Sequence, residues 1–472
     1  MSDISGFCGI SSEAAKASAK RLYLRSSLAS LGGFVRQTLR LSREVDVVED
    51  VDVVVCGGGP AGLAAAVSSA RMGATTLLVE RYGFLGGNFT AASVGTLCGL
   101  YFNTGSGFDF AVSGFPCEVS ERLQRAGAAM GPVPFKETAV LLYIPWAAKR
   151  MGDALATETE GLRVLLHCRA ADAIVETGDD GSRVDGVVLS TKRGLWVVRG
   201  KAYVDATGDA DIAFYAGVPT EIGPPGHRQF ASMQFFIEHA DSQKALPWIQ
   251  RLPEIIAEHG QHLTRDSGAL IPTGRPGEFV GAMTRVTKNG DPIDATDPYD
   301  QTFGEIEGRR IAELTFEFVK KHVPGFENSF LQDTPPQLGI RESRRIQGRF
   351  VLDKHHLLEG TPFEDSVATG AWPLEFHVRG KETTYEFFPP GHRYYLPFRS
   401  LLPEGFANLL VAGRCISATH EALASTRVMA PCMALGQAAG TAAAIAAKEG
   451  LDACSVPVRD LRDALSAAGV EL

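Results

Sequence analysis

The sequence has few features of a metal-binding, disulfide-linked or membrane protein. Its 472 residues include eight cysteines, but they form no CxxC pair and no Cys/His cluster with metal-ligand spacing. We therefore expect no metal site, no iron–sulfur cluster and no disulfide framework. The most apolar stretch, Ala434 to Ala447, is rich in Ala and Gly and shorter than the ~20 residues that a membrane span needs. We expect no membrane span.

A surplus of basic residues is also missing. The chain has 46 Lys and Arg against 55 Asp and Glu, a net charge of −9. Proteins that bind nucleic acids present a basic face, so this balance argues against a nucleic-acid partner. Residues 1–43 contain seven basic and two acidic residues, but neither an apolar core nor a small-residue cleavage site of a signal peptide. We expect a cytoplasmic protein with an N-terminal extension at residues 1–44.

Glycine, in contrast, is abundant, with 51 residues against a usual share of ~7%. The Val-rich run Asp50 to Cys56 is typical of a buried parallel strand, and the sequence GGGPAG follows it at once. A helical pattern, a second strand from Thr75 to Val79, and Glu80 complete a βαβ unit. In this unit Gly57 makes the tight turn, Gly59 lets the backbone approach a pyrophosphate, and Gly62 lets helix and strand pack closely.

The same unit predicts a dinucleotide site. The helix N-terminus offers free N–H groups to an anion, and Glu80 follows Gly62 by 18 residues, where an acid hydrogen-bonds a ribose hydroxyl. The motif alone does not separate FAD from NAD. Two further features favour FAD: the small residues Gly86-Gly87-Asn88, and Thr207-Gly208-Asp209 after a strand at 201–206 that follows short strands from 163 to 199.

Several motifs together resemble those of a known family. The chain contains ERYGFLGG at 80–87, ATGD at 206–209, GIRESRR at 339–345, and VAGRCISATHEA followed by ALGQAAGTAAA within 411–444. Over residues 36–449 it resembles the bacterial FAD-dependent oxidoreductases of the two-dinucleotide-binding-domain flavoprotein type. The resemblance implies an α/β fold, a Rossmann-like FAD-binding domain of glutathione-reductase type with an inserted α+β substrate or cap domain. Non-covalent FAD is favoured, because no histidine lies near Gly86-Gly87.

The resemblance also places the cofactor on particular residues. Arg169 and Ala170 would meet the adenine edge, and Gly413 and Arg414 would lie near the ribityl chain. Pro431 suits the first position of an Ala/Gly-rich helix whose N-terminus would point at the flavin N1–C2=O edge. The complete expected set is Gly57, Gly59, Pro60, Ala61, Gly62, Glu80, Arg81, Gly87, Asn88, Arg169, Ala170, Gly208, Asp209, Gly413, Arg414 and Pro431.

The cofactor motifs lie at both ends of the chain, so we expect a discontinuous FAD-binding domain. Its segments are 45–225 and 335–460, and the cap domain is 226–334 with a contribution from about 355–398. The patterns predict strands at 228–238, 278–287 and within 383–397, and helices at 241–259 and 305–322.

The chain lacks a second GxGxxG and a redox CxxxxC pair. Electrons are therefore expected to come from a small organic substrate bound in the cap, and to leave to an external acceptor, either oxygen, a quinone or a carrier protein. A homo-oligomer is left open.

Four residues are candidates for catalysis. On a helix, Arg341 would share a face with Arg345, and its guanidinium could anchor a substrate carboxylate or the flavin, or else pair with Glu342. His377 could accept an O–H or N–H proton as hydride leaves the adjacent carbon.

The other two candidates lie between the motif at Gly413 and the last helix. His420 is a substrate or proton-transfer candidate whose alternative role is to brace a loop, and Arg427 is a second possible anchor.

We expect an FAD-dependent dehydrogenase or oxidase that transfers a hydride from a small organic substrate to flavin N5. A flavin-dependent monooxygenase is an alternative, although Ala412-Gly413-Arg414-Cys415 stands where aromatic hydroxylases carry a GDAAH-like element. An electron-transfer flavoprotein subunit is another.

Overall fold

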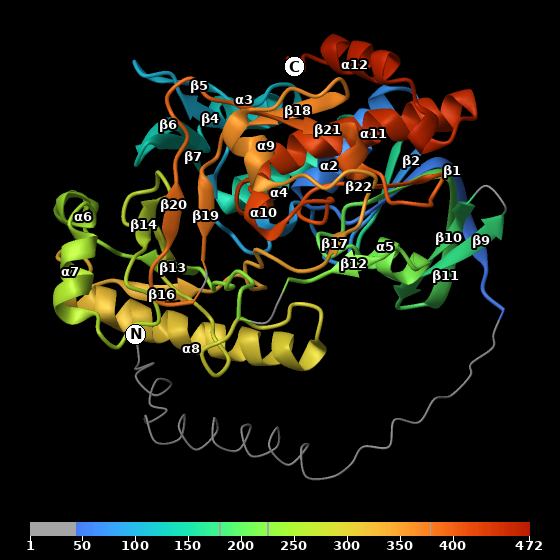
Figure 1. Ribbon diagram of the computed structural model, residues 1–472. Coiled ribbons are helices and arrows are strands. Elements are labelled where there is room, and N and C mark those ends of the chain that lie inside the picture. Colours follow the sequence, from blue (N-terminus) through green and yellow to red (C-terminus); the bar gives the residue numbers. More distant parts are fainter. Residues whose placement is uncertain (1–43, 179–180, 224–225, 378) are drawn as a thin grey trace. The chain divides into compact units, whose positions relative to one another are not determined.

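The largest sheet of the protein combines strands from both ends of the chain (Figure 1). The computed structural model describes residues 44–178, 181–223, 226–377 and 379–472, so the expected N-terminal extension lies outside the described residues except for Glu44. The strand order is β8-β2-β1-β11-β10-β9, and β22 pairs with β11. These strands are β1 (Val47–Cys56), β2 (Thr76–Val79), β8 (Leu162–Leu165), β9 (Arg169–Gly178), β10 (Gly181–Thr191), β11 (Gly194–Asp205) and β22 (Leu409–Val411).

Strand β1 is parallel to β2 and to β11, and β22 is parallel to β11. Strand β22, near the C-terminus, thus joins the same sheet as β1 and β2, which lie in the first hundred residues. The predicted α/β class with a parallel βαβ sheet is confirmed. The strand expected at 201–206 is not separate, because it forms the end of the 12-residue strand β11.

Helix α2 (Pro60–Arg71) follows β1 directly, with Pro60 in its first turn. Gly57 has φ +96°, and a Cβ there would lie 2.5 Å from the Ala206 carbonyl oxygen. A Cβ at Gly62 would lie 1.7 Å from the Gly57 carbonyl oxygen. Both glycines are therefore required by backbone geometry and close packing, as the motif predicts.

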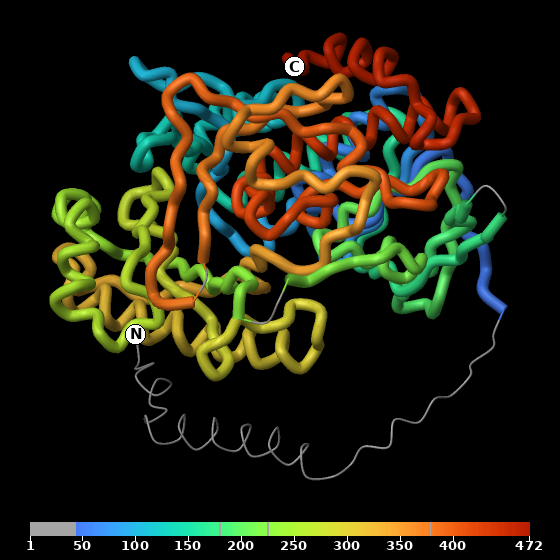
Figure 2. Tube along the Cα trace, viewed as in Figure 1, coloured from blue at the N-terminus to red at the C-terminus, as the bar shows by residue number. Residues whose placement is uncertain are grey.

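Helix α11 (Met429–Glu449) packs against α2, and Figure 2 shows the red C-terminal segment beside the blue N-terminal one. A Cβ at Gly436 would lie 2.0 Å from the Ala61 carbonyl oxygen. The helix is longer than expected and begins at Met429 rather than at Pro431. Its length and composition suffice to cross a membrane, but 94% of its most apolar window is buried inside the protein.

Residues 231–338 form a second sheet with its own apolar core. The order is β14-β15-β13-β16, and helix α8 runs below this sheet in Figure 1, in yellow. The elements are β13 (Phe235–Glu238), α6 (Ser242–Ile249), α7 (Leu252–His259), β14 (Ala269–Pro272), β15 (Phe279–Ala282), α8 (Pro298–His322) and β16 (Phe330–Asp333). We call residues 226–334 the cap region, and its boundaries as a domain stay a prediction.

Several predicted elements have different bounds. The strands expected at 228–238 and 278–287 shrink to β13 and β15, and the helix at 241–259 is divided into α6 and α7. Helix α8 begins earlier than expected, because the Asp297 side chain caps it by accepting from the N–H groups of Tyr299 and Asp300.

The GIRESRR segment is not a helix, so Arg341 and Arg345 do not share a helical face. The N–H of Gly339 bonds the Ser232 carbonyl, and Arg345–Ile346 (β17) pair with Thr220–Glu221 (β12). The backbone of this segment therefore forms hydrogen bonds with residues that are distant in the sequence, rather than with the carbonyl groups four residues earlier, as it would in a helix.

The segment 383–397 holds two strands, β20 (Thr384–Glu386) and β21 (Tyr394–Pro397). Strand β20 pairs with β19 (Leu374–Phe376), and β21 pairs with β18 (Ser366–Gly370). The remaining elements are η1 (Gly87–Phe89), β3 (Thr96–Leu97), β4 (Tyr101–Asn103), β5 (Phe108–Phe110), α3 (Phe115–Arg125), β6 (Ala129–Phe135), β7 (Thr138–Tyr143), α4 (Pro145–Glu158), α5 (Asp211–Ala216), α9 (Lys354–Glu359), η2 (Phe398–Leu401), α10 (His420–Thr426), η3 (Ala453–Ser455) and α12 (Val458–Ala467).

Candidate functional site

Two adjoining cavities lie between the large sheet and the cap region. The smaller, of about 420 Å³, surrounds the turn after β1, and the larger, of about 1030 Å³, extends toward the cap sheet. Five residues line both: Asn88, Ile340, Arg414, Arg427 and Met429. A molecule in the smaller cavity and a second molecule in the larger one could therefore meet at these residues.

The smaller cavity gathers most of the residues expected to hold the cofactor. Gly62 is not among them, because it packs beneath the glycine turn, and neither Arg169, Ala170 nor Pro431 lines either cavity. The expected residues that do line the smaller cavity are Gly57, Gly59, Pro60, Ala61, Glu80, Arg81, Gly87, Asn88, Gly208, Asp209, Gly413 and Arg414.

The turn at Gly59 leaves room for a ligand. The nearest heavy atom to a Cβ built on Gly59 is Gly87 Cα, at 3.9 Å, and the φ of Gly59 is −68°. No side chain caps the N-terminus of α2 at this point. The exposed backbone and the positive end of the helix dipole could therefore hold a pyrophosphate.

Glu80 is buried, and its carboxylate holds the glycine turn. Its Oε2 accepts from the Gly58 N–H at 2.6 Å, and its Oε1 accepts from the Tyr82 N–H at 2.9 Å. Burial raises the pKa of the Glu80 carboxyl against the effect of these two bonds. Glu80 thus fixes the turn as well as facing the cavity where a ribose is expected.

The segment before the GIRESRR motif closes the other side of the smaller cavity. Gln337 Oε1 accepts from Arg81 Nη2 at 2.8 Å and from the Tyr82 hydroxyl. Asn88 Nδ2 donates to the Ile340 carbonyl at 2.9 Å. No sequence pattern indicated this closure, because the contacts join residues about 250 positions apart. Helix α8 adds Gln301, Glu305 and Arg309 to the lining.

Two expected cofactor motifs meet at an ion pair. Asp209 Oδ1 accepts from Arg414 Nη2 at 3.0 Å and from the Ser343 hydroxyl at 2.6 Å. A Cβ on Gly208 would lie 2.7 Å from Arg414 Nη2, so this glycine makes room for the guanidinium.

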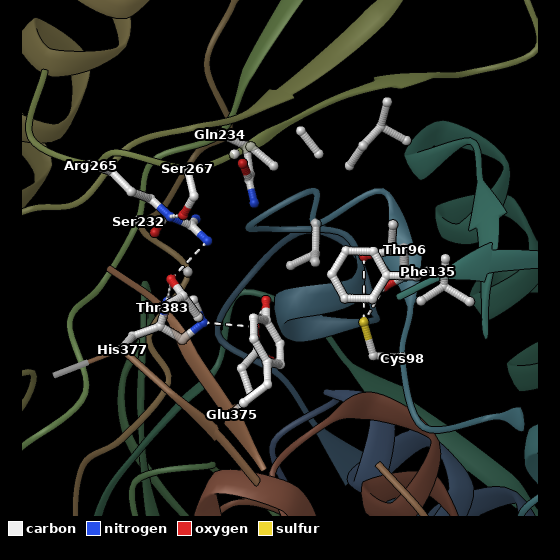
Figure 3. A pocket seen from close by; sticks show the side chains of 18 of the residues that line it. Thr96, Cys98, Phe135, Ser232, Gln234, Arg265, Ser267, Glu375, His377 and Thr383 are labelled. Carbon is white, nitrogen blue, oxygen red and sulfur yellow. Dashed lines mark hydrogen bonds and ion pairs between the residues drawn. The ribbon is translucent and has the colours of Figure 1, made fainter. Parts of the chain in front are cut away.

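The larger cavity has a polar side and an apolar side. Figure 3 shows Arg265, Ser232, Gln234, Thr383 and His377 on one side, and Thr96, Cys98 and Phe135 across from them. Arg341, Trp372, Glu375, Tyr385 and Arg427 complete the lining that concerns the chemistry. Arg341, Arg427 and His377, three of the four predicted catalytic residues, thus line one cavity.

His377 and Glu375 form a buried pair in this wall. His377 Nε2 lies 2.9 Å from Glu375 Oε1, and the Thr383 hydroxyl lies 3.2 Å from His377 Nδ1. Glu375 Oε1 also accepts from the Tyr385 hydroxyl at 3.1 Å. Burial and the charge of Arg341 hold the pKa of His377 well below its ordinary range. The ring is therefore neutral at neutral pH.

Glu375 is the ionised member of the pair. Burial acts to raise the pKa of its carboxyl, but His377 and the charges of Arg427 and Arg341 hold that pKa well below the ordinary range. Trp372 Nε1 donates to Glu375 Oε2 at 3.2 Å, and Arg427 Nη2 lies 3.4 Å from the same oxygen.

His420, the fourth predicted catalytic residue, lines neither cavity. Its Nδ1 lies 2.9 Å from each oxygen of Glu342, and Arg345 Nη1 donates to Glu342 Oε1 at 2.6 Å. This surrounding favours the structural alternative, a histidine that braces a loop.

The site residues predicted from the sequence do not include Glu375, Thr383, Arg265 and Gln234, which line the larger cavity. A partial signal existed, because Glu375 and His377 are two residues apart and such residues share one face of a strand. Thr383 and Arg265 carried no signal, since only the pairing of β19 with β20 and the placement of the cap loop bring them to the cavity.

One cysteine, Cys98, lines the larger cavity. The seven described cysteines are free, and burial raises the pKa of the Cys98 thiol to about 12, which makes it a poor nucleophile at neutral pH. Over the described ranges, no group of three or more His, Cys, Asp or Glu side chains is placed to hold a metal ion.

Comparisons with known proteins concern most of the chain. A family model described as FAD dependent oxidoreductase matches residues 52–465. The mitochondrial dihydrolipoyl dehydrogenase of Caenorhabditis elegans is 35% identical over 91 residues, which is 18% of this chain and 18% of that protein. The chain thus matches only about a fifth of the length of this curated relative.

Two solved structures are similar at low identity. A geranylgeranyl bacteriochlorophyll reductase-like protein from Thermoplasma acidophilum has 14% identity and a TM-score of 0.44, with 89% of this chain and 84% of that chain covered. The p-nitrophenol 4-monooxygenase of Pseudomonas putida DLL-E4 has 12% identity and a TM-score of 0.44, with the same shares covered.

Proposed function

The chain belongs to the FAD-dependent oxidoreductase family, and from this premise we propose that it oxidises a small organic substrate in the larger cavity, with hydride transfer to N5 of FAD held in the smaller one. The family match confirms the predicted FAD cofactor and the predicted oxidoreductase class. The non-covalent attachment of FAD, its contact residues and the cytoplasmic location stay predictions.

The residues of the smaller cavity fit the cofactor. The Gly57–Ala61 turn and the N-terminus of α2 would hold the pyrophosphate, because the backbone there is open and the helix dipole is positive. Glu80 would face the ribose. Arg414, Arg427 and Met429 would lie at the flavin end, where the two cavities join.

The joining of the two cavities is the observation that carries the proposal. A substrate in the larger cavity would touch the same five residues as the end of the cofactor, so its reacting carbon would lie beside the flavin. The larger volume also lies close to the upper limit of the range of ~300–1000 Å³ that is usual for small-molecule sites.

A path for the substrate proton leads into the wall of this cavity. The Thr383 hydroxyl would pass its proton to the neutral His377 Nδ1 as it takes one from the substrate, and Glu375 would stabilise the resulting imidazolium at His377 Nε2. The lowered pKa of His377 leaves Nδ1 unprotonated before the reaction but makes it a weak base, so the ionised Glu375 is needed to stabilise the imidazolium that forms.

The variant Gly59→Val tests the cofactor part. Its backbone φ suits valine and space is free for the added Cβ, so the protein should fold but lose the flavin absorbance at visible wavelengths. Gly107→Val is a matched control, because nothing lies within 4 Å of an added Cβ there, and it should keep the flavin. Flavin retained by Gly59→Val at the wild-type level would contradict the assignment.

Anaerobic mixing with candidate substrates tests the reaction. Bleaching of the flavin by an organic substrate alone would support the dehydrogenase or oxidase. A requirement for a reduced nicotinamide would instead indicate the monooxygenase.

A further inference from the structure

The wall of the larger cavity carries more positive charge than its acidic side chains balance. Arg265, Arg341 and Arg427 line it, and the least exposed acid among its lining residues is Glu375, whose side chain is 13% exposed. Arg265 is 9% exposed and the Arg427 side chain 8% exposed. The acids Asp266 and Glu382 also line the cavity, but both are exposed at its rim.

Two of the three guanidinium groups bond only neutral acceptors. Arg265 donates from Nε to the Ser267 hydroxyl at 3.2 Å and from Nη2 to the Thr383 hydroxyl at 3.0 Å. Arg341 donates from Nη1 to the Phe230 carbonyl at 2.6 Å and to the Ser232 hydroxyl at 2.9 Å. Neither forms an ion pair with any of the described residues.

Two buried arginines outside this cavity, in contrast, have acidic partners. Arg345, whose side chain is 1% exposed, pairs with Glu342 and Glu221, and Arg344 pairs with Asp211. The chain as a whole carries a net charge of −9, so acids are not scarce. The cavity that is proposed to hold the substrate therefore contains two arginines without the acidic partners that Arg344 and Arg345 have.

Such an arrangement is unfavourable without a ligand. A buried charge that lacks a counter-charge destabilises the folded protein. Burial, together with the charges of Arg427 and Arg265, lowers the pKa of Arg341 to about 9. The buried Oε1 of Gln234, in the same wall, also has no hydrogen-bond partner among the described residues. Arg265 and Arg341 lack an acidic partner, and Gln234 Oε1 lacks a hydrogen-bond donor, among the described residues. All three line one cavity, so this cavity fits a ligand that carries a negative charge and a hydrogen-bond donor.

We propose that the substrate is an organic carboxylate, bound through its anionic group by Arg265 and Arg341 and through its apolar body by the side of the cavity that contains Phe135 and Trp372. Gln234 Oε1 accepts a hydrogen bond from an O–H or N–H group of the same molecule. Arg427 faces both cavities, so it serves the substrate, the cofactor or both. This assignment rests on the proposed oxidation in the larger cavity.

Titration of the FAD-loaded full-length protein with paired probes tests the substrate class. The probes are benzoate, phenylacetate and hexanoate, each with its neutral amide, and the readout is the change in flavin absorbance. We expect at least one acid to bind more than tenfold tighter than its amide. Arg265→Gln and Arg341→Gln should each weaken that acid by roughly 10- to 100-fold, because each removes a charged hydrogen bond.

Controls separate a binding role from a structural one. Arg341→Lys keeps the charge and should bind the acid more tightly than Arg341→Gln. Arg275→Gln removes an exposed arginine that pairs with Glu278 and should leave binding unchanged. Thermal melting of each variant should show a folded protein, because neither Arg265 nor Arg341 forms an ion pair with any of the described residues.

Each outcome bears on one proposal at a time. Equal binding of every acid and its amide, or unchanged binding in both glutamine variants, would overturn the carboxylate assignment. Flavin reduction by a neutral or cationic substrate would also overturn it, while the oxidoreductase proposal would stand. Arginine-dependent binding of an acid, with no organic molecule able to reduce the flavin, would remove the proposed hydride transfer and leave the carboxylate site.

Discussion

The protein contains two buried histidine–glutamate pairs that differ in what surrounds them. His377 and Glu375 are 2.9 Å apart, and His420 and Glu342 are separated by the same distance. From the sequence both histidines are candidates for catalysis. The pairs themselves are therefore no guide to which one serves the reaction.

The surroundings differ in charge balance and in access to a cavity. Arg345 and the Gln229 N–H hold Glu342, whose side chain is fully buried and lines no described cavity. Glu375 instead lies in the wall of the larger cavity, where it pairs with Arg427 but forms no ion pair with Arg265 or Arg341. A pair that is complete without a ligand stabilises the fold, whereas an unbalanced one beside a cavity is a candidate for chemistry.

The largest effect is expected from breaking the pair of His420 and Glu342. Glu342→Gln should lower the free energy of unfolding by roughly 3 kcal/mol, the lower end for a broken buried pair, because Arg345 keeps Glu221 as a partner. Urea unfolding of the FAD-loaded variant measures this change. A loss below about 1 kcal/mol would mean that the cluster does not stabilise the fold.

A substitution in the pair of His377 and Glu375 should change the rate of flavin reduction rather than the stability of the fold. His377→Ala should keep FAD but slow flavin reduction by about 100-fold or more, as expected for the loss of a proton acceptor. His420→Ala should change that rate by no more than about threefold, because His420 does not reach the cavity. Anaerobic stopped-flow absorbance compares the two, and equal slowing in both variants would erase the distinction.

The smallest effect concerns pH. Burial lowers the pKa of His377 in the folded protein, while an unfolded histidine titrates near pH ~6.5. Below that pH the unfolded chain binds the extra proton, so this contribution to stability is complete above pH ~6.5 and is lost as pH falls, by up to about 1.4 kcal/mol per unit. His377→Gln should reduce this slope in urea unfolding measured between pH 5 and pH 8. A slope identical to wild type would mean that His377 is not buried as a neutral ring.

The sequence predicted the cofactor side in detail because its requirements are local. Gly57 and Gly62 are dictated by backbone contacts within one βαβ unit, and such contacts leave a glycine signature. Glu80, Asp209 and Arg414 also lie in recognisable sequence motifs, and all three line the smaller cavity. The predicted start of the last core helix at Pro431 was wrong by two residues, because the helix begins at Met429.

The substrate side could not be read in the same way. Arg265 comes from a loop of the cap region, Arg341 from an irregular segment and Thr383 from the connection between β19 and β20. A helical reading of GIRESRR was wrong, since its backbone bonds strands and loops distant in the chain.

The sequence by itself determined the α/β class, the parallel sheet and the glycine turn that fits a dinucleotide, because each depends on contacts within a few tens of residues. The tertiary structure alone decided which buried histidine faces a cavity and which arginines lack a counter-charge. Charge balance in a low-dielectric interior is a sum over neighbours from every part of the chain, and no local pattern records that sum.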